Sequence, residues 1–109
     1  MANTETVNIS KIVGTLDTAG ATSGITVKGS KLLDISVDFD TSTAFVGDIR
    51  LQRKTATGAA NIGEWQDVET YTASAEKVAQ SATTRQYRLN VVTATSGTAE
   101  FELCAGNFS

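Results

Sequence analysis

The 109-residue sequence contains no histidine, no proline and only one cysteine. Without histidine, it lacks the side chain that most often acts as a general acid or base near neutral pH, and also the commonest metal ligand. The single cysteine, Cys104, can form neither an internal disulfide nor a multi-cysteine zinc site. These absences favour a protein that is not an enzyme and that needs no metal or other cofactor.

Long apolar runs and an excess of positive charge are also absent. No apolar run approaches the ~20 residues that cross a membrane, and the first residues lack the basic and apolar regions of a signal peptide. We therefore expect a protein that is made in the cytoplasm and has no membrane partner. The net charge of −3 argues against a nucleic-acid partner, because phosphate binding needs a basic face.

Aromatic residues make up only 6% of the chain, which predicts a lean hydrophobic core. The length suffices for one domain that folds without disulfides or metal. Because few large side chains can be buried, we expect stability to depend on an oligomer or a larger assembly as much as on the core.

The sequence is rich in segments where apolar and polar residues alternate, which is the pattern of half-buried β-strands. The cleanest example covers residues 33–40, and another begins at Phe45. A polar loop at about Ala56 to Gly63 leads to a strand that starts near Trp65 and completes a hairpin. Further strands are predicted at 7–13, 25–27, 77–82, 85–92 and 98–105.

These seven to eight strands are separated by polar turns, and only residues 73–80 leave room for a helical turn. The pattern predicts an all-β protein, an antiparallel two-sheet sandwich that is immunoglobulin-like or jelly-roll-like. We assign this single domain to residues 11–109. Residues 1–10 begin with small polar side chains and are predicted to form a flexible N-terminal arm.

Trp65, the only tryptophan, has two interpretations: a residue that packs in the core or in the hairpin, or a platform on which a ligand stacks. The packing role is favoured, because buried tryptophans anchor the cores of β-sandwiches. Trp65 and Val68 can both face inward only across a β-bulge, which we place at Gln66–Asp67.

Two groups of charged residues allow either a ligand site or a solvent-facing role. The acidic row lies along one strand face and lacks the tight glycine-containing loop that wraps Ca²⁺, which favours a solvated face. Its members are Asp34, Ser36, Asp38 and Asp40. The cationic group would cluster if its strands are neighbours, and we expect cross-strand or intersubunit ion pairs in preference to a nucleic-acid site. Its members are Arg50, Arg53, Lys54, Arg85 and Arg88.

Two further features favour structural roles. Cys104 has no histidine partner, so a subunit contact or a covered edge is favoured over a catalytic nucleophile. The segment Gly24 to Ser30 has glycines near a lysine but lacks the G-K-[ST] order of a phosphate loop. We interpret it as a turn after the short strand at 25–27.

Two segments from residue 46 onward contain recurring strand patterns: residues 46–53, VGDIRLQR, match G-x-[IV]-x-L-x-R, and residues 63–72, GEWQDVETYT, match W-x-x-V-x-x-[YF]-T. Both patterns resemble those of small all-β proteins of tailed bacteriophages. The segments YRLNV (87–91) and TSGTA (95–99) resemble the Y-R-L-x-V and S-G-T that close such domains. The loop differs, because residues 57–63 stand where those proteins usually carry an aspartate- and glycine-rich turn.

The resemblance implies a virion structural protein of the capsid surface, most directly a decoration or cement protein that binds and stabilises the shell of the major capsid protein. The alternative is a tail or head–tail accessory domain that binds a host-surface carbohydrate or receptor. The implied partners are the major capsid protein and other copies of this chain. An extended arm can grip a shell through main-chain hydrogen bonds alone, so we expect the contact in the N-terminal arm. The candidate partner-binding residues are Thr4, Glu5, Thr6, Val7 and Ile9.

Overall fold

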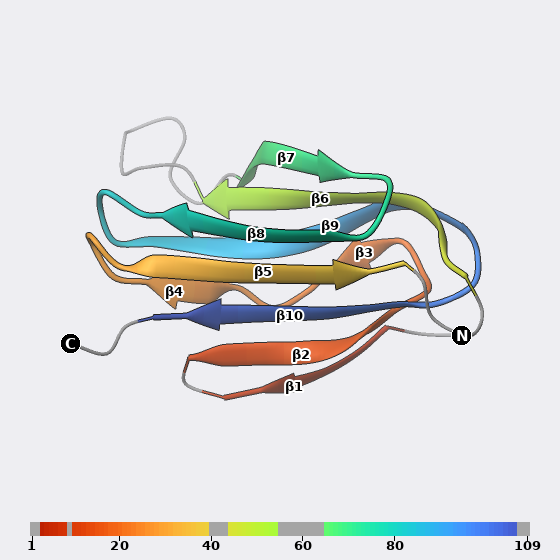
Figure 1. Cartoon of the computed structure of the whole chain (residues 1–109), viewed down its shortest axis with the longest axis horizontal. Coiled ribbons are helices and arrows are strands. Elements are labelled where there is room, and N and C mark those ends of the chain that lie inside the picture. Colours follow the sequence, from red (N-terminus) through yellow and green to blue (C-terminus); the bar gives the residue numbers. More distant parts are fainter. Residues whose placement is uncertain (1–2, 9, 40–43, 55–64, 107–109) are drawn as a thin grey trace.

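Ten β-strands and no helix form the regular structure of this computed structural model, which describes residues 3–8, 10–39, 44–54 and 65–106. The strands make two antiparallel sheets of five strands each, stacked as two layers (Figure 1). The predicted all-β, two-sheet sandwich is confirmed. The strand count exceeds the predicted seven to eight because the first predicted strand is in fact two strands and an additional two-residue strand, β3 (Gly20–Ala21), lies where none was predicted.

The first sheet combines strands from both ends of the described chain with two from its middle. In spatial order it contains β1 (Thr4–Val7), β2 (Lys11–Leu16), β10 (Ala99–Ala105), β5 (Leu32–Asp38) and β8 (Ala75–Gln80). β10 lies at the centre, where Leu103 stands opposite Ile12 of β2 and Ile35 of β5. Residues 75–80 are an edge strand, so the structure has no helical turn there.

The second sheet is organised around the longest strand, β9. In spatial order it contains β3 and β4 (Ile25–Val27), then β9 (Arg85–Ser96), β6 (Val46–Lys54) and β7 (Trp65–Tyr71). β3 and β4 pair one after the other with the same side of β9, and β6 pairs with its other side. β9 continues past the predicted end at residue 92, and two register irregularities against β6 accommodate the extra length.

The core lies between the two sheets and is built from the inward positions of the alternating strands. The row at 33–39 behaves as predicted: its apolar residues are buried, whereas Asp34, Ser36 and Asp38 point outward. The rings of Phe39 and Phe45 meet edge to face, with centroids 5.0 Å apart. The buried apolar residues are Ile12, Leu16, Ile25, Val27, Leu33, Ile35, Val37, Phe39, Phe45, Ile49, Leu51, Tyr71, Tyr87, Leu89, Val91, Ala99, Phe101, Leu103 and Ala105.

β1 occupies residues that were predicted to belong to a flexible arm. It pairs with β2 along its whole length. Asn3 anchors the start of the strand, because its Oδ1 accepts the N–H groups of Asp17 at 2.8 Å and Thr18 at 3.0 Å, and its Nδ2 donates to the Thr18 carbonyl at 2.9 Å. The structure therefore corrects the expected arm for residues 3–8. Main-chain pairing and one asparagine side chain order a segment that is too polar to enter the core.

A β-bulge interrupts the pairing of β7 with β6. The register shifts between Leu51 and Gln52, and Val68 is the extra residue on β7. A bulge was predicted in this strand at Gln66–Asp67, so its existence is confirmed and its position is corrected. Since side chains alternate between faces, the extra residue exchanges the inward and outward positions on its two sides.

Polar contacts bridge the two sheets at both open sides of the sandwich. On one side, the carboxylate of Glu5 in β1 accepts the N–H of Ser23, between β3 and β4, at 3.3 Å. On the other side, Glu69 of β7 lies 3.7 Å from the ammonium of Lys77 in β8 and accepts the hydroxyl of Tyr71 at 2.7 Å. Burial and the hydrogen bond to Glu69 raise the pKa of Tyr71, so its hydroxyl keeps its proton as a donor.

Candidate functional site

Trp65 lies on the outer face of the second sheet, so the prediction that it is a buried core anchor is wrong. The bulge at Val68 is the reason: Trp65 and Tyr71 would otherwise share a face, but Tyr71 enters the core whereas Trp65 pairs with Lys54 on the outside. Trp65 is half-buried. Its indole reaches Gly24, where a Cβ would stand 3.2 Å from Cη2. Its contact with Lys54, its partner across the hairpin, agrees with the predicted packing in the hairpin. Its exposed half also allows the alternative interpretation, a platform for a ligand.

A chain of polar contacts runs across the same face beside Trp65. The guanidinium carbon of Arg88 lies 4.3 Å from the centroid of the indole, and its Nε donates to Oε1 of Gln52 at 2.8 Å. Asp67 then accepts two hydrogen bonds, from Nε2 of Gln52 at 2.9 Å and from Nη1 of Arg50 at 2.8 Å. Because Gln52 is only 8% exposed, the network fixes Arg88 against the sheet.

The pKa values of Asp67, Arg50 and Arg88 are shifted for different physical reasons. Hydrogen bonds from Gln52 and then Arg50 lower the pKa of Asp67. Hydrogen bonds to Asp48 and then Asp67 raise the pKa of Arg50. Burial alone lowers the pKa of Arg88, and no described carboxylate lies within ion-pair distance of its guanidinium. Arg88 is therefore a partly desolvated cation without an anionic partner in the described part of the chain.

We expect Asp67→Asn to lower the melting temperature at pH 7 and to lower it progressively less as the pH falls below about 4. The folded-state pKa of Asp67 lies below its ordinary value of 3.8, so its carboxylate stabilises the fold above about pH 4. That contribution is lost as the pH falls through the folded-state value. Because the side chain is 44% exposed, the effect at pH 7 should be small, about 1–3 °C. Thermal unfolding of parent and variant across this pH range tests it, with Asp34→Asn on the other sheet as control; an equal difference at every pH would contradict it.

The structure brings together only part of the predicted cationic group. β6 and β9 are neighbours, as the clustering required. Three members share the outer face of the second sheet, namely Arg50, Lys54 and Arg88. Arg53 and Arg85 lie at the alternate strand positions, which belong to the opposite face of the sheet. They stand opposite the buried Tyr87 and Val27, respectively, and therefore do not cluster with the other three cations. The contact of Arg50 with Asp67 is a cross-strand ion pair of the expected kind.

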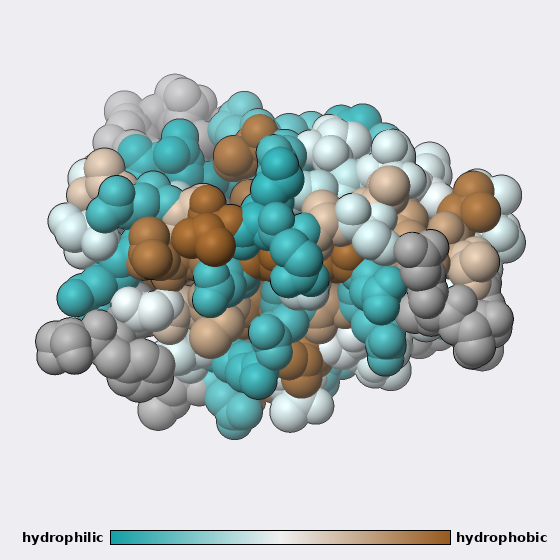
Figure 2. All heavy atoms as spheres, viewed as in Figure 1, coloured by the Kyte–Doolittle hydropathy of each residue, from teal (hydrophilic) through white to brown (hydrophobic). Residues whose placement is uncertain are grey.

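The outer face of the first sheet mixes hydrophilic side chains with exposed apolar ones (Figure 2), and most of its charges are negative. Its acidic residues are Asp34, Asp38, Glu76, Glu100 and Glu102. Lys11 contacts Glu102 at 3.0 Å, and this hydrogen bond raises the pKa of Lys11. Among the described residues, no group of three or more acidic or cysteine side chains is arranged to hold a metal ion. Asp40, a member of the predicted acidic row, lies outside the described residues.

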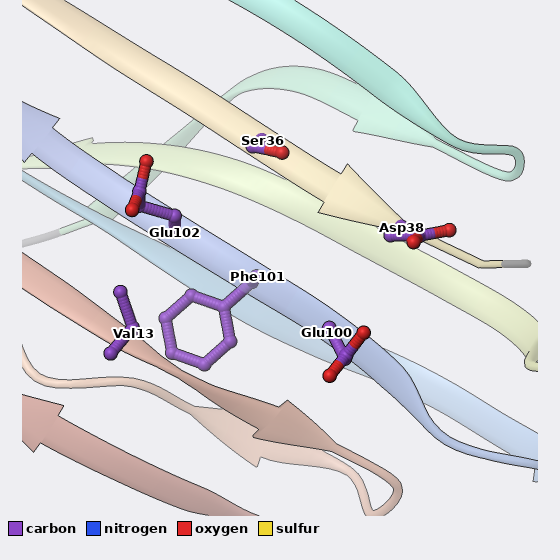
Figure 3. A pocket seen from close by; sticks show the side chains of 6 residues that line it. All are labelled: Val13, Ser36, Asp38, Glu100, Phe101 and Glu102. Atoms are coloured by element: carbon purple, nitrogen blue, oxygen red, sulfur yellow. The ribbon is translucent and has the colours of Figure 1, made fainter. Parts of the chain in front are cut away.

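An open depression lies on this acidic face over β2, β5 and β10 (Figure 3). Its lining residues are Val13, Ser36, Asp38, Glu100, Phe101 and Glu102. The hydroxyl of Ser36 bonds to the carboxylate of Glu76, and that of Ser74 lies 3.4 Å from Asp38. Because the depression is open and its charged groups share one sign, we assign no ligand to it.

Four of the five predicted partner-binding residues form the edge strand β1, and all four are exposed. They are Thr4, Glu5, Thr6 and Val7. The fifth, Ile9, lies outside the described residues. β1 ends the first sheet, so its outer side pairs with no strand of the described chain.

Cys104 lies on the outer face of β10, opposite Lys11 on one side and Asp34 on the other, and is partly exposed. Its contact with another subunit stays a prediction. The segment 24–30 contains the predicted short strand, β4, followed by a turn in which Ser30 has a φ of 70°. It therefore has the expected strand-then-turn form.

The network around Gln52 was not found from the sequence. Its only sequence signal is the run of polar residues at alternate positions of β6, Asp48, Arg50, Gln52 and Lys54. That run identifies an outward face, but it does not identify Asp67 or Arg88 as partners. Those pairings depend on the position of the bulge and on the register of β9.

The described residues contain no helix that is long and apolar enough to cross a membrane. Comparisons with protein-family models, with curated proteins and with solved structures found no match. The likeness to phage proteins therefore rests on the sequence segments quoted above, and any functional conclusion must be argued from those segments and from the surfaces just described.

Proposed function

We propose that this protein is a non-enzymatic structural protein of a tailed-bacteriophage virion. In this proposal it is made in the host cytoplasm, binds the outer surface of the shell formed by the major capsid protein, and stabilises that shell together with other copies of itself. The sequence resemblance supplies the class of protein. The structure adds the surface that suits the role, the exposed edge strand β1 of the first sheet.

The orientation of the main-chain groups in β1 is the observation that carries the proposal. The N–H of Asn8 donates to the carbonyl of Lys11 at 2.8 Å, which makes these residues a hydrogen-bonded pair. Such pairs alternate with non-bonded pairs along an antiparallel ladder, so the N–H groups of Glu5 and Val7 point away from β2. An extended strand of the shell protein can pair with them through its main chain, without requiring particular side chains.

The opposite edge of the same sheet carries a comparable feature. Lys77 of β8 stands opposite the buried Ile35 and lies 3.7 Å from Glu69 of the other sheet, and Glu5 of β1 likewise bonds to Ser23 across the sheets. A charge on the inward side of an edge strand opposes the addition of a further strand, so this feature does not separate the two edges. β8 is therefore the alternative contact if β1 fails the test below.

A contact made by a four-residue strand is short, so a single copy should bind weakly. A capsid offers the same site many times, and a symmetric oligomer presents several β1 strands together. Avidity then supplies the affinity that one strand lacks. An assembly of this kind also agrees with the lean core.

We expect Val7→Pro to reduce binding to undecorated capsids by roughly tenfold or more. Proline removes the N–H that points outward from β1, but the ladder to β2 should persist, because Val7 and Ile12 form a non-hydrogen-bonded pair. The measurement is the fraction of protein that co-sediments with capsids over a concentration series.

Val7→Thr is the matched control, because it keeps the N–H group and the β-branched shape. It should co-sediment like the parent, and both variants should melt within a few degrees of it. Parent-like binding by Val7→Pro would show that β1 is not the contact. Retention on host cells in the absence of capsid binding would support the alternative of a tail or head–tail domain.

A further inference from the structure

Arg88 is held in one orientation and retains unused donors. Its Nε is bound to Gln52 at 2.8 Å, and its guanidinium lies over Trp65 with 4.3 Å between the guanidinium carbon and the ring centroid. Its terminal nitrogens donate to no residue of the described chain. Arg50 on the same face differs, because Asp48 and Asp67 both engage it. A guanidinium fixed in this way loses little side-chain entropy when it receives a ligand.

Trp65 and Lys54 add a flat apolar surface and a second cation beside Arg88. The ammonium of Lys54 lies 5.9 Å from the indole centroid and, within the described residues, forms no ion pair with a carboxylate. The indole packs against Gly24 at one edge but remains only half-buried. The result is a half-exposed indole of fixed orientation with two cations over its ring.

The chemistry of this group matches a ligand that has both an anionic group and a flat apolar side. A carboxylate accepts parallel hydrogen bonds from a guanidinium, and the C–H groups of a sugar ring can pack on the part of the indole that the two cations leave exposed. We infer that Trp65, Arg88 and Lys54 form a binding site for a saccharide that carries a carboxylate. The site lies on the sheet opposite to β1 and adds a binding activity to the proposed function.

The charge of this face favours a carboxylate over a phosphate. On the outer face of the described strands β6, β7 and β9 there are three cations, Arg50, Lys54 and Arg88, and two anions, Asp48 and Asp67, so these residues carry a net charge of only +1. A monoanionic sugar acid suits that small excess. A chain of phosphates would require a larger basic surface.

Titration of the full chain with oligogalacturonate, and with the same oligosaccharide as its methyl ester, tests the site directly. We expect the acid to bind and to change the fluorescence of Trp65, the only tryptophan. The neutral ester should bind at least tenfold more weakly, and added salt should weaken only the binding of the acid. Equal affinity for acid and ester would overturn the inference.

Three variants locate the binding. Arg88→Gln and Lys54→Gln should each weaken oligogalacturonate at least fivefold, as measured by calorimetry. Arg53→Gln removes the adjacent charge from the other set of positions on β6 and should bind like the parent. Among the described residues, the side chain of Lys54 contacts the indole of Trp65 and forms no ion pair. Lys54→Gln should therefore fold, and it keeps the test decisive if Arg88→Gln fails to fold.

Two results would overturn the site. One is an equal loss of affinity in Arg53→Gln, which would indicate unspecific attraction between charges. The other is that polyglutamate binds and oligogalacturonate does not, and that Arg88→Gln and Lys54→Gln weaken the binding of polyglutamate. The surface would then be a binding site for an acidic protein. Neither result depends on whether Val7→Pro decorates capsids, so this site and the proposed function can fail separately.

Discussion

Gly14→Ala is expected to detach β1 from the first sheet and to lower the free energy of unfolding by roughly 1–3 kcal/mol. A Cβ at this position would stand 1.9 Å from the carbonyl oxygen of Thr4 and 2.8 Å from Cα of Glu5. Both are backbone atoms, so rotation of a side chain cannot relieve the overlap. Because every residue of β1 is exposed, the core should survive and the damage should be confined to the edge of the sheet.

Hydrogen exchange measures this effect at the affected strand. The amides of Thr4 and Thr6, which point toward β2, should lose their protection while those of β10 keep theirs. Gly29→Ala is the matched control, since a Cβ there meets nothing closer than 3.5 Å. If β1 carries capsid binding, Gly14→Ala should also fail to decorate capsids. Parent-like exchange and melting in Gly14→Ala would show that β1 tolerates the extra methyl group.

Leu103→Ala is expected to cost roughly 2–5 kcal/mol, the largest effect among these variants. Leu103 is fully buried on the central strand β10, between Ile12 and Ile35. Its removal leaves a cavity that paired strands on both sides cannot readily close. The loss combines the transfer free energy of the missing atoms with the cost of that cavity.

Trp65→Ala should cost less than Leu103→Ala, roughly 1–2 kcal/mol, although tryptophan is the larger side chain. The substitution removes the stacking of the indole with Arg88 and the apolar area that the indole buries on the outer face of the sheet. It opens no cavity in the core. Urea unfolding followed by circular dichroism compares the two variants with the parent. A cost for Trp65→Ala that equals or exceeds that of Leu103→Ala would return Trp65 to the role of core anchor.

The alternation of apolar and polar residues determined most of the strands and their buried faces. Leu33, Ile35, Val37 and Phe39 are buried as their spacing predicts, and residues 99, 101 and 103 behave in the same way. This prediction succeeds because successive side chains of a strand point to opposite faces. When only one face contacts the core, the local sequence alone indicates which residues are buried. The sandwich follows, because two such faces must cover each other.

Features that depend on pairing between distant strands were decided only by the tertiary structure. The segment 3–8 is polar, yet β2 and the Asp17–Thr18 backbone order it through hydrogen bonds that no local pattern reveals. In β7, the position of one extra residue, Val68, decides whether Trp65 faces the core or the solvent. A shift of one residue reverses the face of every side chain beyond it. The site around Trp65 and Arg88 therefore exists because of register, which the tertiary structure sets and the sequence pattern leaves open.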